Sequence, residues 1–264
     1  HPMEFPVKTG EDIDLMREFY DDITVEYSEE EDRNAREWYD NIGQSAAVQS
    51  TIGKSPMMRW VEWLAGVENA HYLLADYPGK VEALFEAMHR MLIRKTELAA
   101  EHAAADLLYF SENTSTSLIS PNQYRKYCMP HLHDYGEILQ AGGRNLVLHM
   151  CGLIKDLLPD LATLPAKAFE AFTSPPVANT RLIDGRTACP NTCLIGGTNA
   201  ELWVHDADHI IAHIKRDLDA LPHHSGIIVS SAGQMPPPCP PETIKAVCDW
   251  VKSYPARMEA PVEV

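Results

Sequence analysis

Residues 145–152, Asn145-Leu146-Val147-Leu148-His149-Met150-Cys151-Gly152, join an apolar run to a polar end. The apolar part has the length and composition of a buried strand. His149 and Cys151 lie two positions apart, and side chains at i and i+2 of a strand point to the same face. The pair can therefore converge on one ion or one substrate. We predict that this strand end organises both the fold and the function.

Similar apolar runs alternate with segments of helical periodicity along the whole chain. The predicted strands are 46–52, 106–110, 145–149, 168–172, 193–199 (which includes the exit loop of its strand) and 226–231. The predicted helices are 11–18, 29–38, from 55, from 78, from 120 through 135, 154–164, 205–218 and from 241. This alternation indicates parallel βαβ units with right-handed crossovers. We predict an α/β protein with a (β/α)8 TIM-type barrel. Because a closed barrel needs eight strands, we expect its opening strands to be weak or to lie upstream of His1.

The bulk composition limits the domain count and the class of partner. A chain of 264 residues, 45% of them hydrophobic, can build one large core, so we predict a single domain over 1–264 with an acidic helical segment at 1–44. The formal net charge of −16 argues against nucleic acid or an anionic membrane surface as a partner. We find no run of about 18 apolar residues and therefore expect no membrane span. No secretory signal pattern is visible and the six cysteines do not resemble a disulfide framework, so we expect a cytoplasmic protein with reduced thiols.

Polar side chains follow the ends of several predicted strands. In a (β/α)8 barrel the loops at the C-terminal ends of the strands build the active site, so we expect these side chains to face one mouth. Besides His149 and Cys151, we predict a catalytic role for Glu112. The predicted substrate-binding residues are Asn113, Thr173, Asn199 and Gln234.

His149 and Cys151 are also candidate metal ligands. Zinc favours imidazole and thiolate, and a catalytic zinc keeps three protein ligands and one open position. By their chemistry, Cys239 and Glu112 are the candidates for the third ligand. Such a zinc would hold an incoming thiol as a nucleophilic thiolate. The alternative is a buried cysteine beside a histidine that is hydrogen-bonded in a strand-end loop.

A second possible metal face lies on the helix predicted over 205–218. His205, His209 and His213 are spaced at i, i+4 and i+8, so they share one side of that helix. This geometry can bind a metal, but it is more often a partly exposed helix face, and we favour that interpretation.

Four sequence pieces together resemble the uroporphyrinogen decarboxylase superfamily. They are Ser120-Pro121 before an aromatic helix, His149-Met150-Cys151-Gly152, Gly196-Gly197-Thr198-Asn199, and Ser231-Ala232-Gly233-Gln234 before a proline-rich loop. The resemblance spans about residues 45–255. Within the superfamily, His-x-Cys-Gly is more similar to the corrinoid-dependent methyltransferases. This implies transfer of a methyl group between a corrinoid (cobalamin) protein and a small acceptor, either a thiol such as coenzyme M, through zinc, or tetrahydrofolate.

The resemblance also implies a zinc ligand set, from which this sequence departs. In the thiol-using members the ligands are the His and Cys of His-x-Cys, here His149 and Cys151, and a later Cys at the exit of the last strand. Gln234 stands at that later position, and Cys239 follows five residues on. Either the loop brings Cys239 to the metal, or the third ligand is lost and tetrahydrofolate becomes the favoured acceptor.

Two other functions stay open at this stage. A decarboxylase of the porphyrinogen type needs cationic clamps for carboxylates, and we find no arginine-rich N-terminal segment of that kind. A barrel that has lost its chemistry and only binds a corrinoid protein or a small ligand is the second alternative, since one fold hosts many roles.

Overall fold

The computed structural model describes residues 4–258, which form two compact units. The first unit comprises 4–112 and 118–147, and the second comprises 113–117 and 148–258. The ends of the predicted 1–264 domain lie outside the described residues, and the single domain stays a prediction.

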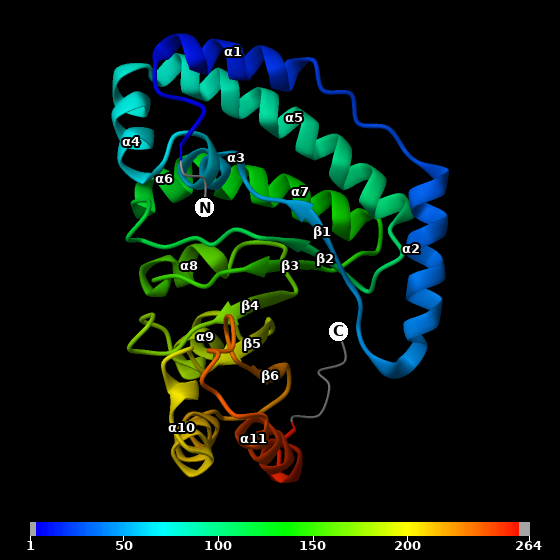
Figure 1. The fold of residues 1–264 in the computed structure, drawn as a ribbon, viewed down its shortest axis with the longest axis vertical. Helices are drawn as coiled ribbons and strands as arrows, with labels where there is room; N and C mark the ends of the chain where they lie inside the picture. Colours follow the sequence, from blue (N-terminus) through cyan, green and yellow to red (C-terminus); the bar gives the residue numbers. More distant parts are fainter. Residues whose placement is uncertain (1–3, 259–264) are drawn as a thin grey trace. The chain divides into compact units, whose positions relative to one another are not determined.

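The first unit contains the beginning of the parallel sheet (Figure 1). Strand β1 (Gln49–Gly53) pairs in parallel with β2 (Leu107–Phe110). The backbone N–H of Leu108 donates to the carbonyl of Asn145, 2.9 Å away, where β3 (Leu146–His149) begins. The strands predicted over 46–52 and 106–110 are thus present, with shifted starts.

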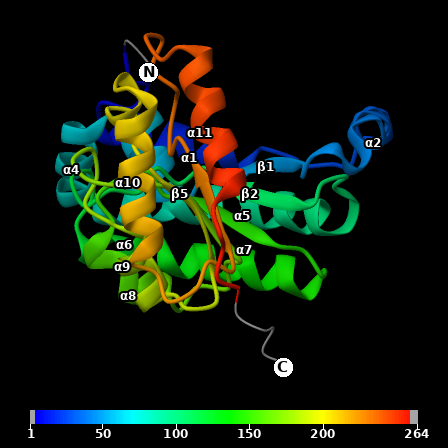
Figure 2. The ribbon, with the colours of Figure 1, turned by 90° about the horizontal axis from the view of Figure 1, so that it is seen from below.

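Helices form most of the first unit. They are α1 (Gly10–Asp21), α2 (Glu29–Ile42), α3 (Pro56–Arg59), α4 (Val67–Asp76), α5 (Pro78–His102), α6 (Pro121–Tyr127) and α7 (Met129–Ala141), with a 3-10 turn at Gly43–Ser45 and a π turn at Trp60–Leu64. Helix α1 packs along α5, and α2 and α4 lie at opposite ends of the unit (Figures 1 and 2). Helix α2 buries none of its side chains, as expected for an acidic, solvated helix.

The apolar spacing and the N-terminal proline of α5 explain why this segment forms a helix. Its buried side chains include Val81, Leu84, Phe85, Met88 and Leu92, which repeat at helical spacing. Pro78 stands in the first turn, where the missing N–H costs no intrahelical hydrogen bond. The predicted helix from 78 is therefore confirmed.

The single helix predicted from 120 through 135 is wrong, because the chain forms α6 and α7 there. The N–H of Cys128 still donates to the Tyr124 carbonyl at 2.9 Å, but Pro130 has no N–H to continue the series. The helix predicted around 154–164 is confirmed only in part: the helical residues are a 3-10 turn (Lys155–Leu157) followed by the short α8 (Leu158–Leu161), which contains Pro159.

The second unit continues the parallel pairing. Strand β4 (Ala168–Phe172) pairs with β5 (Cys193–Gly197), and β5 pairs with β6 (Ile227–Ser230). The N–H of Met150, just after β3, donates to the Glu170 carbonyl at 2.8 Å. The helices are α9 (Leu182–Ala188), a 3-10 turn at Leu202–Val204, α10 (Ala207–Asp219) and α11 (Pro241–Ser253). Helices α10 and α11 lie side by side (Figure 1).

The α/β class with strands and helices in alternation is confirmed. Among residues 4–258 there are six strands in the order β1-β2-β3-β4-β5-β6, so the described part of the chain does not form a closed eight-stranded barrel. None of the described helices has both the length and the apolar character that crossing a bilayer requires.

Candidate functional site

The end of β3 is fixed by close contact with residues 113–117 of the same unit. Leu146, Val147 and Leu148 are buried, and His149 follows them at the strand end. A Cβ on Gly152 would lie 2.3 Å from the Cβ of Ser115 and 2.4 Å from the Thr114 carbonyl oxygen. Only glycine fits such an approach. The glycine of His-x-Cys-Gly therefore sets the path of the turn that carries Cys151.

His149 forms an ion pair with Glu170 of β4. The two atoms joined are Nδ1 of the imidazole and Oε2 of the carboxylate, and the side chains are 19% and 25% exposed. Burial by itself lowers the pKa of His149, but hydrogen bonds to Cys151 and Glu170 outweigh it and raise that pKa to about 9. His149 is thus an imidazolium at neutral pH.

Glu170 was missed by the sequence analysis. It lies in Ala168-Phe169-Glu170-Ala171-Phe172, where the other four residues are all apolar. Burying a lone carboxylate in a strand costs free energy unless the carboxylate is paired. The single Glu in an apolar strand was therefore the sequence feature that could have indicated a partner.

The backbone next to Glu170 is distorted. Ala171 has a φ of +56°, and the register between β4 and β5 shifts between Glu170 and Phe172. On β5, a Cβ at Gly196 would lie 2.4 Å from the Phe172 carbonyl oxygen. Positive φ at a non-glycine residue costs about 1–2 kcal/mol, and such residues cluster at functional sites. Asn113 (φ +49°) and Ala232 (φ +51°), in the same unit, share this feature.

Asn113 is brought to the His149–Cys151 corner, as the sequence predicts. Its N–H donates to the His149 carbonyl at 3.0 Å, and its Oδ1 accepts a hydrogen bond from Cys151 Sγ at 3.5 Å. His149, Cys151, Asn113 and Glu170 therefore form one connected polar cluster, which we call the His149 corner.

Thr173 and Asn199 are buried and hold loops together. The Thr173 hydroxyl donates to the carbonyls of Ala171 (2.7 Å) and Ala232 (3.2 Å). The Asn199 amide donates to Ser174 Oγ (2.9 Å) and the Pro175 carbonyl (3.0 Å), and it accepts from the Leu202 N–H (2.9 Å). These bonds give both residues positioning roles, and their contact with substrate stays a prediction.

The last predicted residues, Gln234 and Cys239, lie in the loop after β6. Gln234 is exposed, whereas Cys239 is buried, with its Sγ 3.9 Å from the Pro240 carbonyl oxygen. Within residues 4–258, His149, Cys151 and Cys239 do not form a group whose ligand atoms all lie within 4.8 Å of one another. The residues present thus fit zinc only in part, since two ligands and a carboxylate partner are together and the third ligand is not.

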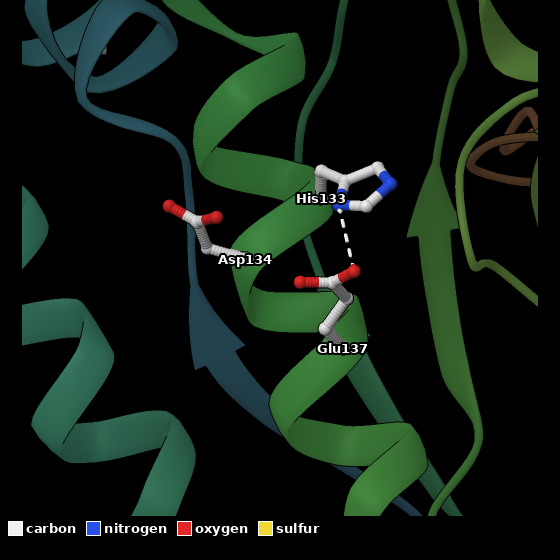
Figure 3. A group of neighbouring side chains, drawn as sticks. All are labelled: His133, Asp134 and Glu137. Carbon is white, nitrogen blue, oxygen red and sulfur yellow. Dashed lines mark ion pairs between the residues drawn. The ribbon is translucent and has the colours of Figure 1, made fainter.

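The described residues contain one group of three possible ligands, His133, Asp134 and Glu137 of α7 in the first unit (Figure 3). Glu137 pairs with His133 at 3.5 Å, while Asp134 extends away from them and pairs with His89 at 3.2 Å. Asp134 and Glu137 are exposed. The three residues lie on one helix and form one ion pair among themselves and one with His89 of α5, and exposed acidic groups are common without a metal. His205, His209 and His213 belong to no such group in the described part of the chain.

Glu112 lies in the first unit and is fully buried. Its carboxylate accepts from the Ser55 N–H and from the Ser55 hydroxyl, each at 2.6 Å. Burial raises the pKa of Glu112, and the two hydrogen bonds from Ser55 act in the opposite direction. The sequence suggested Ser55 only as a helix cap. The catalytic role of Glu112 stays a prediction.

Comparison with known proteins places the chain in a family. No curated protein matches it. A methyltransferase from Methanosarcina mazei has a similar fold, with a TM-score of 0.66 and 16% sequence identity over 84% of this chain. The chain spans 63% of the length of that structure. The model of the family described as uroporphyrinogen decarboxylase (URO-D) matches residues 60–254, which is most of the sequence. The predicted resemblance is thus confirmed: the chain belongs to the uroporphyrinogen decarboxylase family.

Proposed function

We propose that this chain is a methyltransferase that moves a methyl group between a corrinoid protein and a small acceptor. The proposal rests mainly on the His149 corner, where an imidazolium paired with Glu170 lies beside the thiol of Cys151 at the end of a parallel strand. Family membership and the fold shared with a protein named as a methyltransferase support the proposal. The acceptor is a thiol such as coenzyme M, or tetrahydrofolate.

The reaction needs little covalent chemistry from the protein. In the forward direction the acceptor's sulfur or nitrogen attacks the methyl carbon, the carbon–cobalt bond breaks, and its electron pair stays on cobalt. The acceptor's proton leaves to solvent. A cation beside an acceptor thiol favours the thiolate form of that acceptor, which is the nucleophile. His149 supplies such a cation, and Glu170 holds its ring. Asn113 fixes Cys151 through the 3.5 Å hydrogen bond.

Zinc, if bound, would hold an acceptor thiol as a thiolate. His149 and Cys151 would supply two ligands, and Glu170 on Nδ1 would orient the imidazole, as carboxylates do at many metal sites. Because the described residues do not bring Cys239 to this pair, we assign no step to the metal. The metal content of wild type, Cys151→Ala and Cys239→Ala distinguishes a zinc site that includes Cys239 from a corner without a third cysteine ligand. Loss of about one zinc per chain in both variants would place Cys239 in the ligand set.

Methyl transfer from methylcobalamin to coenzyme M, and separately to tetrahydrofolate, tests the proposal. We expect transfer to one acceptor in wild type and a loss of at least about 100-fold in His149→Gln and in Cys151→Ala. His209→Gln is the matched control, because His209 is exposed on α10, and it should keep wild-type activity. Transfer that is unchanged in His149→Gln contradicts the proposal. Turnover of uroporphyrinogen, without methyl transfer, would establish the decarboxylase alternative. Binding of a corrinoid protein without turnover of any substrate would establish the non-catalytic one.

A further inference from the structure

A pocket of about 370 Å³ lies in the first unit, at the carboxyl ends of β1 and β2. Gly53 and Ser111 contribute from the two strand ends, and α5 forms one wall. The volume falls within the range of small-molecule sites, about 300–1,000 Å³. In parallel α/β sheets, ligands bind outside the carboxyl ends of the strands. Position and size therefore suit a small ligand.

The lining of this pocket is cationic, although the chain carries a formal net charge of −16. Lys54, Arg59 and Lys95 all contribute. Lys54 is paired, since its Nζ lies 2.6 Å and 2.7 Å from the two carboxylate oxygens of Glu62. Both of those side chains are 9% exposed, so the ion pair holds Lys54 in place in the pocket wall.

Arg59 and Lys95 have no carboxylate partner among residues 4–258. The Lys95 ammonium donates one hydrogen bond to the Ile52 carbonyl, 2.7 Å away. The Arg59 guanidinium lies 5.6 Å from the centre of the Trp63 ring. Burial, and then the charge of Arg59, lower the pKa of Lys95. Lys95 is partly buried, whereas Arg59 is exposed. The two cations repel each other, and an anion bound by both would offset this cost.

The wall of the pocket that α5 forms is largely apolar. Met88, Met91 and Leu92 of α5 line the pocket with flexible apolar groups. Apolar lining with a few convergent charged groups is the usual composition of a site for a small organic molecule, and methionine adapts to varied shapes.

We propose that this pocket binds a small amphipathic organic anion. Its oxyanion head pairs with Arg59 and Lys95, and its apolar body packs on Met88, Met91 and Leu92. The pocket residues all belong to the first unit and share none with the His149 corner. The proposal therefore stands or fails independently of methyl transfer.

Titration of the full chain with hexanoate, followed by NMR of 13C-methyl methionine, tests the proposal. We expect saturable shifts of the Met88 and Met91 methyl signals, assigned with Met88→Leu and Met91→Leu. 1-Hexanol, which lacks the charge, and inorganic phosphate, which lacks the apolar body, should each bind at least about tenfold more weakly, a difference of about 1.4 kcal/mol.

Substitutions that each remove one positive charge locate the site. Arg59→Gln and Lys95→Gln should weaken hexanoate binding at least about tenfold. Arg94→Gln is the matched control, since Arg94 is the neighbour of Lys95 on α5, lies outside this pocket and is exposed. It should change binding less than about twofold. Thermal midpoints close to wild type would show that the variants are folded.

Three results would overturn the proposal. The first is the absence of saturable shifts up to about 10 mM hexanoate. The second is equal affinity for 1-hexanol and hexanoate, which would show that the pocket binds apolar groups without recognising the negative charge. The third is an effect of Arg94→Gln as large as that of Arg59→Gln. It would show that hexanoate responds to the general positive charge of this region and not to Arg59 in the pocket.

Discussion

His149 Nδ1, at the end of β3, is bonded to the carboxylate of Glu170, the only acidic residue of β4. The bond joins the carboxyl end of β3 to the middle of the neighbouring strand β4 and fixes the orientation of the imidazole. The same imidazole also forms a hydrogen bond with Cys151, so both neighbours hold the ring in place.

Removing this carboxylate should impair the His149 corner without unfolding the unit. We expect Glu170→Gln to lower methyl transfer by about 10- to 100-fold, because the ring loses its orienting partner. In metal-free protein the pKa of His149, measured by NMR, should fall below about 9, since Glu170 is one of the groups that raise it. Glu201→Gln is the control, because it removes the same kind of partner from exposed His205. If Glu170→Gln leaves both quantities unchanged, the bond has no role in the site.

Gly152 should tolerate no side chain. The added Cβ of Gly152→Ala would meet Ser115 Cβ at 2.3 Å, and we expect a loss of about 3 kcal/mol in the free energy of unfolding. Gly79→Ala is the matched control, because nothing lies within 4 Å of its added Cβ and the residue is in the first turn of α5. It should stabilise the chain by up to about 1 kcal/mol. Urea denaturation measures both, and equal effects of the two substitutions would refute the argument from contact.

His131 should make the first unit sensitive to acid. Burial and the neighbouring His89, whose ring centre is 4.2 Å away, lower the pKa of His131 to about 4. The unfolded chain, with an ordinary pKa near 6.5, binds the proton more readily. Stability is therefore complete above about pH 6.5 and decreases as the pH falls toward 4, by up to roughly 3 kcal/mol.

The variant His131→Gln should flatten this pH dependence. The quantity to measure is the free energy of unfolding in urea at several pH values between about 4 and 7. Exposed His133, on the same helix, provides the control substitution His133→Gln, which should retain the wild-type slope. A wild-type slope in His131→Gln would show that other groups cause the acid sensitivity.

Ser55 should stabilise the first unit through Glu112. Ser55→Ala removes the hydroxyl donor at 2.6 Å and leaves part of a buried carboxylate unsatisfied, so we expect a loss of about 2 kcal/mol at pH 8. The pKa of Glu112 is already raised by burial and should rise further without this donor. The loss should therefore shrink as the pH falls and the carboxyl becomes neutral. Ser50→Ala, at an exposed position of β1, is the control and should cost about nothing in the same urea titrations. A loss that grows toward acid pH would contradict this reasoning.

Much of the fold followed from local pattern. The apolar spacing of α5, the proline in its first turn and the apolar run of β3 depend on residues within a few positions of one another. The His-x-Cys spacing likewise placed His149 and Cys151 together at a strand end. The break between α6 and α7 was equally local and was readable from Pro130, but the aromatic pattern on both sides obscured it.

The partners of these residues were decided by tertiary structure alone. Glu170 is 21 positions from His149, and Ser55 is 57 positions from Glu112. Asn199 is a residue type that can bind a substrate, yet its amide N–H groups donate to Ser174 and Pro175 in the loop after β4 and its oxygen accepts from Leu202 in its own loop. Pairing at such separations depends on strand register, a bulge at Ala171 and packing density, and none of these leaves a periodic mark in the sequence. The sequence by itself determined which side chains could do chemistry, and the fold determined which of them meet.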